Sequence, residues 1–247
     1  MRNRALSILL SAIALAAPAL PVAAQDVPGL VLFSSGKAGD PMPKGWEVIK
    51  INESKKLTDY KLVDDDGKVV LKATADQSAS AIGQYISVDL TKTPVVEWRW
   101  KINKLIATAD MEYGRTEDSP VRLVFAFDGD PKKLSLSDKT SGAIAKSLSG
   151  QELPFATLMY VWANKQPVDT IIRNPHTGQI RMIVVASGGA GVGKWQTLSR
   201  NVREDYKRAF GEYPGRMLHY GVLSDTDNTG DSIEAWYGDI VFKPASK

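Results

Sequence analysis

The chain has 247 residues, with 31 Lys and Arg against 28 Asp and Glu, a formal charge of +3 and no cysteine. No run of basic residues is longer than two, which argues against a nucleic-acid-binding protein, because such proteins need a concentrated basic surface. Without cysteine there is no disulfide and no thiol nucleophile, so stability must come from a packed core, to which six Trp contribute.

The first 24 residues have the features of a secretory signal peptide. Arg2 and Arg4 precede a mostly apolar run over residues 5–17, and small residues lead to a cleavage position after Ala24. The run is too short to span a bilayer, and no later segment is long and apolar enough to form a membrane helix. The sequence therefore predicts a periplasmic or secreted protein whose single mature domain covers residues 25–247, with no membrane span after cleavage.

Most of the mature sequence has the two-residue period of half-buried strands. Apolar and charged residues alternate from Val95 to Ile102, so one face of this strand packs and the other meets water or a ligand. The same reasoning predicts strands at residues 60–63, 68–73, 121–127, 157–163, 180–187, 218–224 and 234–242. Eight strands separated by turn residues predict an all-β protein, an antiparallel β-sandwich of jelly-roll type.

Two segments have the spacing of short helices. Asn201 is suited to cap a helix, Glu204 follows three residues later, and Gly211 ends the segment. A second helix is predicted over residues 138–148, with Gly150 as its end. We expect both helices to cover an edge or an end of the sandwich.

An acidic loop between two apolar strands is the most informative local feature. It contains Asp225, Asp227, Asn228, Gly230 and Asp231. Such a loop can bind a cation, contact a polar ligand, or form a turn in which the side chains bond the nearby backbone. Its opening matches the calcium-binding helix-loop-helix pattern, but the twelfth place, which needs a bidentate Glu, is Trp236. All three interpretations stay open, and a structural calcium would be held by Asp225, Asp227, Asn228 and Asp231.

A glycine-rich segment, residues 188–194, matches the phosphate-binding loop up to Lys194. The next residue is Trp195, where a phosphate loop needs Ser or Thr to hold magnesium, and no helix is predicted to follow. We therefore predict a flexible loop beside the sandwich rather than a nucleotide site.

Aromatic and basic residues on the predicted strands suggest a ligand platform. Trp98 and Trp100 lie on the apolar side of their strand, which predicts that they pack in the core. Tyr160 and Trp162 lie on a strand with apolar residues on both sides, so they could line a groove. The charged groups that could extend over such a groove are Glu97, Arg99, Arg122 and Arg181. A flat apolar surface with charged arms suits sugars and uronic acids, although each charged residue could equally belong to a solvated strand face.

Catalytic patterns are weak. There is no Gly-x-Ser-x-Gly elbow, and the two His residues do not have the spacing of a helical zinc site. The groups available for β-elimination of a polysaccharide are Arg122 or Arg181, to neutralise a uronate, and Tyr160 or His219, to move the proton. A glycosidase would need Glu97 and Glu234 within about 5–10 Å of each other.

Six motifs in a fixed order resemble an uncharacterised bacterial family of exported proteins described as a domain of unknown function. They are Trp98-Arg99-Trp100, Tyr160-Val161-Trp162, Arg200-Asn201-Val202 with Asp205-Tyr206, Phe210-Gly211-Glu212, the segment 225–230 and Tyr237-Gly238-Asp239-Ile240. The resemblance extends over residues 32–242 and implies a β-sandwich similar to carbohydrate-binding modules, with no established activity. We therefore expect an exported protein that binds a glycan or related polar ligand without chemistry. A lyase acting on uronate glycans and an envelope module that binds a periplasmic protein are the alternatives.

Overall fold

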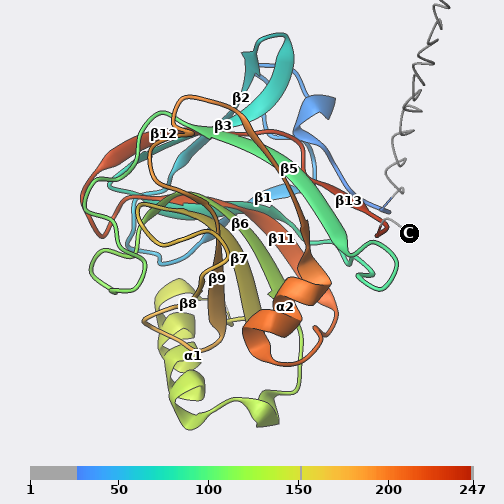
Figure 1. Cartoon of the computed structure of the whole chain (residues 1–247), viewed down its shortest axis with the longest axis vertical. Coiled ribbons are helices and arrows are strands. Elements are labelled where there is room, and N and C mark those ends of the chain that lie inside the picture. The colour runs from blue at the N-terminus through green and yellow to red at the C-terminus, as the bar shows by residue number, and fades with distance from the viewer. Residues whose placement is uncertain (1–26, 151, 246–247) are drawn as a thin grey trace, which may run out of the picture.

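Two β-sheets packed face to face make up most of the computed structural model, which describes residues 27–150 and 152–245. The helices α1 (Leu136–Ser149) and α2 (Val202–Phe210) both lie in the lower half of the molecule in Figure 1. The predicted signal peptide, residues 1–24, lies outside the described residues. In the described part of the chain, none of the helices has the length and apolar character needed to cross a membrane.

Seven strands form one sheet, in the order β1-β4-β11-β6-β7-β9-β8. Their bounds are β1 Trp46–Lys50, β4 Ala79–Gln84, β6 Ser119–Phe127, β7 Ala156–Ala163, β8 Ile171–Arg173, β9 Ile180–Ser187 and β11 Met217–Asp225. The other sheet has the order β10-β5-β12-β3-β2, and β13 also pairs with β5. Its strands are β2 Asp59–Asp65, β3 Lys68–Asp76, β5 Val95–Ile102, β10 Gln196–Asn201, β12 Ser232–Tyr237 and β13 Val241–Lys243. Two short 3-10 helices, Phe33–Ser35 and Pro131–Lys133, complete the fold.

The predicted antiparallel β-sandwich is confirmed, with one departure from the antiparallel pattern. The strands β7 and β9 run parallel, because β8 lies beyond β9 at the edge of the sheet and pairs antiparallel with it. The predicted strand at residues 234–242 is also two strands, β12 and β13. They separate at Gly238, where a Cβ atom would lie 2.5 Å from the side chain of Arg99.

Both predicted helices are confirmed, and their ends explain why the sequence reveals them. In α2, Asn201 caps the first turn by accepting a hydrogen bond from the backbone N–H of Glu204, at 3.1 Å. Gly211 ends the helix with a positive φ of 84°, a conformation that favours glycine. The glycine-rich segment is followed by the strand β10 rather than a helix, so the context of a phosphate-binding loop is absent there.

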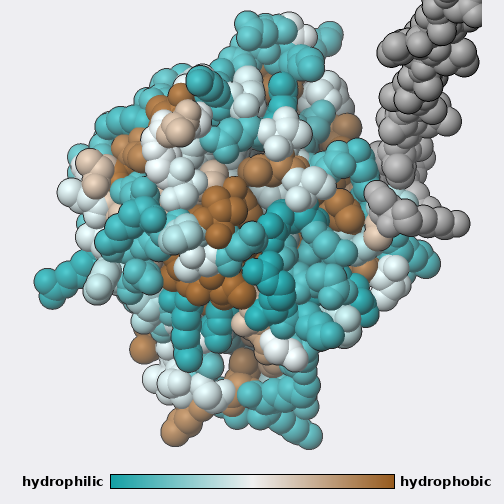
Figure 2. Space-filling view, in the orientation of Figure 1, coloured by the Kyte–Doolittle hydropathy of each residue, from teal (hydrophilic) through white to brown (hydrophobic). Residues whose placement is uncertain are grey.

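The core lies between the sheets and is rich in aromatic side chains. Trp98 and Trp100 are buried in it, as their strand period predicts. A second, smaller apolar cluster lies on the opposite face of the seven-stranded sheet, where Met111 covers residues of β7, β8 and β9. Figure 2 shows apolar side chains in the middle of the visible face, near β8 and β9. The seven-stranded sheet is therefore apolar on both faces, and its outer face is available to form a site.

Candidate functional site

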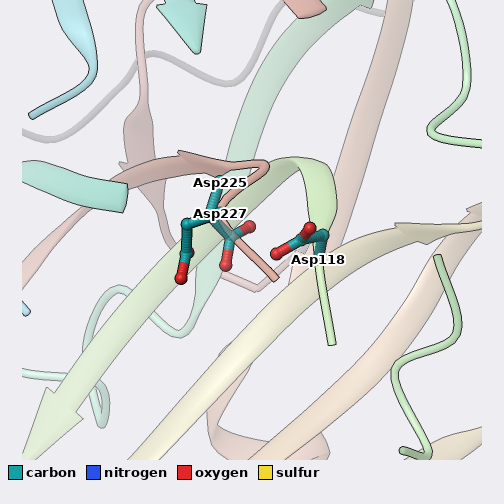
Figure 3. A group of neighbouring side chains, drawn as sticks. All are labelled: Asp118, Asp225 and Asp227. Carbon is teal, nitrogen blue, oxygen red and sulfur yellow. The ribbon is translucent and has the colours of Figure 1, made fainter. Parts of the chain in front are cut away.

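Three carboxylates meet at the end of β11. Asp225 is the last residue of this strand, Asp227 lies in the following turn, and Asp118 precedes β6. One carboxylate oxygen of each lies within 4.8 Å of the others, and Figure 3 shows Asp118 pointing toward the other two. The acidic loop predicted from the sequence is thus joined by a carboxylate from a distant segment.

Asp225 forms a buried ion pair with Arg122. Its two carboxylate oxygens accept hydrogen bonds from Nε and Nη2 of Arg122, at 3.2 and 3.0 Å. The Nη1 atom of Arg122 also pairs with Glu117, at 2.9 Å, and only 1% of the Arg122 side chain is exposed. Because Arg122 is enclosed by two acidic partners, it cannot neutralise a uronate ligand as the sequence suggested.

The other two carboxylates of this group also have partners in the protein. Asp227 forms an ion pair with Lys55. Asp118 accepts hydrogen bonds from the backbone N–H groups of Asn228, at 3.3 Å, and Thr229, at 2.7 Å, and from the Thr229 hydroxyl, at 2.6 Å. These contacts stabilise the turn. They support the structural interpretation of the loop, in which its acidic side chains serve to hold the backbone.

The four predicted calcium ligands do not converge. Asn228 directs its side-chain Nδ2 toward the carbonyl of Gly114, at 3.4 Å, and Asp231 instead pairs with Lys104, at 2.8 Å. Of the predicted set, the structure brings together Asp225 and Asp227. The carboxylates that a calcium ion could use are therefore Asp118, Asp225 and Asp227, and each of them already has a partner in the protein.

The electrostatic environment of Asp225 favours the protonated form. Burial raises the pKa of Asp225 to about 7, and the carboxylates of Glu117 and Asp118 act in the same direction, while Arg122 acts to lower it. The guanidinium of Arg122 keeps its charge, because the carboxylates of Asp225 and Glu117 raise its pKa against the effect of burial. The cluster therefore has one fixed cation and one carboxylate that titrates near neutrality.

Tyr160 and Trp162 do not form an open platform. Their exposed fractions are 0% and 1%, because both point from β7 into the space between the sheets. The Tyr160 hydroxyl donates to Asp205, at 2.8 Å, and the Trp162 indole donates to the carbonyl of Gly188, at 3.0 Å. Burial raises the pKa of Tyr160 well above its usual value, so it is unsuited to move a proton. Both residues are part of the core.

The other two arginines predicted to bind a ligand, Arg181 and Arg99, lie on different sheets. Arg181 hydrogen-bonds the carbonyl of Ile180, at 3.2 Å, and its guanidinium lies 5.3 Å from the ring centre of Phe210. Arg99 belongs to the other sheet, where its guanidinium stacks on Trp195 at 4.2 Å from the ring centre. The predicted platform with its three arginines is therefore not assembled at one place.

A cavity of about 540 Å³ lies instead between α1 and the outer face of the seven-stranded sheet. Residues of β1, β4, β6, β7, β9 and β11 form its floor, and residues of α1 line the opposite side. The apolar residues that line it are Ile49, Ile51, Ala81, Val124, Ile144, Ala145, Leu148, Leu153, Pro154, Met159, Ile180 and Leu223. This size is within the range of small-molecule sites in proteins, roughly 300–1,000 Å³.

Helix α1 is held at both ends by polar contacts. Asp138 accepts a hydrogen bond from the backbone N–H of Gly178, at 2.6 Å, and the Leu148 carbonyl accepts one from the backbone of Glu53, at 3.0 Å. Between these contacts, no residue of the helix is buried. Ile144 and Leu148 line the cavity and remain 56% and 49% exposed. The helix thus lies across the sheet with two apolar side chains that line the cavity and stay about half exposed.

Charged and imidazole side chains also line this cavity. Its lining includes Glu117, which pairs with Arg122, and Lys55, which pairs with Asp227, so the cavity adjoins the acidic cluster. His176 lies with its Nε2 atom 4.0 Å from Glu117. His219 also lines the cavity, and burial lowers its pKa, which favours the neutral imidazole.

Several of the groups predicted for catalysis are not placed to act. Glu97 lies within β5, whereas the Glu234 backbone N–H bonds the side chain of Asn103, just beyond the far end of that strand. Six residues of strand correspond to roughly 20 Å, too far apart for a glycosidase carboxylate pair. For β-elimination, Arg122 is enclosed by acidic partners and Tyr160 is buried in the core, so neither can act on a polysaccharide.

Sequence reasoning did not identify the cavity. The signal that could have found it is the pair Ile144 and Leu148, which share one face of a predicted helix, together with a sheet that is apolar on both sides. An amphipathic helix beside a doubly apolar sheet needs a partner for its apolar face. The sequence does not show that the helix stands away from the sheet.

Comparisons with known proteins place the chain in a family. No curated protein matches it in sequence. Among solved structures, it is similar to endoglucanase 3 of Trichoderma harzianum, from family GH12, with a TM-score of 0.42, 10% identity, and 81% of this chain and 91% of that chain covered. It is also similar to the xyloglucanase domain of NopAA, a type three effector of Sinorhizobium fredii, with a TM-score of 0.44, 7% identity, and 84% and 96% covered. Both TM-scores are below 0.5, so no property of these proteins is carried over to this chain. The family model for a protein of unknown function, DUF3047, matches residues 44–241, so the chain belongs to the DUF3047 family.

Proposed function

We propose that this protein is exported and binds a small ligand, without chemistry, in the cavity between α1 and the seven-stranded sheet. The observation that carries the proposal is the cavity of about 540 Å³, lined on one side by a helix whose apolar residues Ile144 and Leu148 stay about half exposed. Export is inferred from Arg2, Arg4 and the apolar run that follows them.

A ligand in the cavity would supply the missing packing. Apolar surface removed from water contributes roughly 25 cal/mol per Å², so covering two large aliphatic side chains and the sheet floor is a favourable contribution to binding. The apolar part of the lining is aliphatic, and among the described residues the lining contains no Trp, Phe or Tyr ring. Sugar sites use aromatic rings for stacking, so this cavity suits an apolar molecule better than a glycan.

The test is to fill the cavity from the helix side. Ala145 lines the cavity, whereas Ser147, two residues later on the same helix, is exposed and does not. We expect Ala145→Trp to abolish the fluorescence enhancement of the uncharged apolar dye Nile red, and Ser147→Trp to leave it unchanged. Equal enhancement in both variants, or none with the unsubstituted protein, would contradict ligand binding in this cavity.

A glycan is the second candidate, on a different face. Arg99 stacks on Trp195 on the outer side of the six-stranded sheet, and its guanidinium has no ion-pair or hydrogen-bond partner among the described residues. The Trp195 indole donates to Asp65, at 2.6 Å, which fixes the ring. A fixed ring beside an unpaired guanidinium suits an acidic sugar, since Arg binds carboxylates in a bidentate manner.

Binding of oligogalacturonates tests the second candidate. We expect Arg99→Ala and Trp195→Ala each to weaken binding, and Lys243→Ala to leave it unchanged, because Lys243 is already paired with Glu97. Absence of binding to acidic oligosaccharides removes this candidate. A rise in ultraviolet absorbance from an unsaturated uronate would instead show a lyase.

A further inference from the structure

The charged groups that line the α1 cavity all have partners inside the protein. Lys55 pairs with Asp227 and Glu117 pairs with Arg122; these are the two more enclosed pairs, in which only the Lys55 side chain is substantially exposed, at 32%. Lys50 pairs with Glu53 and Glu152 pairs with Lys146, both at 2.7 Å, and these two pairs are exposed. No charge of the lining is therefore left without a counter-charge among the described residues.

This pairing determines which ligand the cavity can accept. A charged head group at the enclosed end would have to displace Asp227 or Arg122 from an existing pair, or be buried without a counter-charge, and both are unfavourable. At the exposed pairs the charges are solvated, so a charged ligand would gain little there. The cavity thus disfavours anions and cations alike.

Uncharged hydrogen-bonding groups are available in the same lining. Asn174 accepts hydrogen bonds at Oδ1 from the backbone N–H groups of His176, at 2.9 Å, and Thr177, at 3.3 Å, which fixes its amide plane. Its Nδ2 group has no partner among the described residues. A fixed amide donor at the edge of an aliphatic cavity can bind a hydroxyl or carbonyl oxygen.

We infer that the α1 cavity selects an uncharged amphipathic molecule, with an aliphatic body and one hydroxyl or carbonyl group that Asn174 binds. This inference rests on the proposed function and names the class of its ligand. Fatty alcohols, aldehydes and other neutral aliphatic molecules belong to this class; fatty acids, alkylamines and sugar acids do not.

Three probes with the same chain and different head groups test the inference: decanol, decanoate and decylamine. Binding to the mature protein is measured by calorimetry at neutral pH. We expect decanol to bind at least about tenfold more tightly than either charged probe, because burying an unpaired charge is unfavourable. If decanoate or decylamine binds as tightly as decanol, or none of the three binds while Nile red does, the inference is wrong and the proposed function stands.

Two substitutions should each shift the preference of the cavity from decanol toward a charged probe. Asp227→Asn releases the Lys55 ammonium at the cavity, so we expect the affinity for decanoate to rise about tenfold with that for decanol unchanged. Asp231→Asn is the matched control, since it releases Lys104 outside the lining.

Asn174→Asp keeps the acceptor for the two backbone groups and replaces the donor by an anion, so decanol should bind more weakly and decylamine more tightly. Unchanged preferences in both Asp227→Asn and Asn174→Asp would overturn the role of charge pairing. If neither Nile red nor any alkyl probe binds, the proposed function fails as well.

Discussion

Tyr160 stacks on Trp98 across the space between the two sheets, with ring centres 5.3 Å apart and ring planes 6° from parallel. Tyr160 comes from β7 of the seven-stranded sheet and Trp98 from β5 of the other. The Tyr160 hydroxyl reaches Asp205, which also pairs with Arg200, at 2.7 Å, and Arg208, at 2.8 Å. One side chain thus joins both sheets to the segment that carries α2.

Two substitutions of Tyr160 separate its ring from its hydroxyl. Tyr160→Phe keeps the stack and loses one hydrogen bond, and should cost about 1 kcal/mol of unfolding free energy, since Asp205 keeps its arginine partners. Tyr160→Ala removes the stack and leaves a cavity, and should cost about 3–5 kcal/mol. Urea unfolding measures both, and equal losses would show that the stack is not the main contribution.

Replacing Arg122 should lower the free energy of unfolding more than replacing Asp225, its partner in the buried ion pair. Arg122→Met leaves the buried Asp225 and the partly buried Glu117 without their cation and should cost about 3–5 kcal/mol of unfolding free energy. Asp225→Asn should cost only about 1 kcal/mol at neutral pH, because Glu117 still pairs with Arg122 and Asp225 is readily neutralised. A larger loss for Asp225→Asn than for Arg122→Met would contradict this assignment of charges.

A strand with a marked two-residue period is predicted accurately, whereas one strand made of small residues is missed. Val95–Ile102 is found at its exact bounds because large apolar and charged residues alternate along it. Ala79–Gln84 is missed because its residues are mostly small. The structure explains their size, since a Cβ atom on Gly221 of the neighbouring strand would lie 2.4 Å from the carbonyl of Ile82. Close packing of backbones leaves no hydrophobic pattern in the sequence.

The site was harder to predict than the fold for two physical reasons. The strand of Tyr160 is apolar on both faces because the sheet is covered on both sides, so its period cannot tell the inter-sheet face from the outer one. The second reason is distance along the chain: Asp225 meets a partner, Arg122, that is 103 residues away. Local spacing identified the acidic loop but could not show that a buried arginine neutralises it.

Stability should depend on pH through Asp225. Its pKa in the folded protein, about 7, is above the usual 3.8, so between about pH 7 and pH 4 the folded protein binds a proton that the unfolded chain does not. This contribution to the unfolding free energy therefore grows as pH falls through that window. His219 acts oppositely. Burial lowers its pKa, so as pH falls the unfolded chain binds a proton at this imidazole before the folded protein does, and this contribution to the unfolding free energy decreases.

Asp225→Asn isolates the carboxyl contribution. The free energy of unfolding of the unsubstituted protein, relative to that of Asp225→Asn, should increase as pH is lowered from about 7 to about 5. The groups that face Asp225, namely Arg122, Glu117 and Asp118, are the same in both proteins. A difference that stays constant with pH, or that decreases, would show that Asp225 is ionised throughout the window.

The acidic cluster should bind calcium only after Lys55 is removed. In the unsubstituted protein Asp225 and Asp227 are paired with Arg122 and Lys55, and Asp118 is bonded by the turn, so a cation would have to compete with existing contacts. Lys55→Met leaves Asp227 without its cation, and three carboxylates within 4.8 Å then offer the oxygen ligands that calcium prefers.

Thermal melts with calcium and with chelator provide the measurement. We expect millimolar calcium to leave the melting temperature of the unsubstituted protein unchanged and to raise that of Lys55→Met, because an ion bound only by the folded state stabilises it. Lys104→Met is the control, since it frees Asp231, which lies outside the cluster. A chelator-reversible rise in the unsubstituted protein would instead mean that calcium displaces Lys55 from Asp227. No rise in Lys55→Met would mean that Arg122 alone supplies the positive charge this cluster needs.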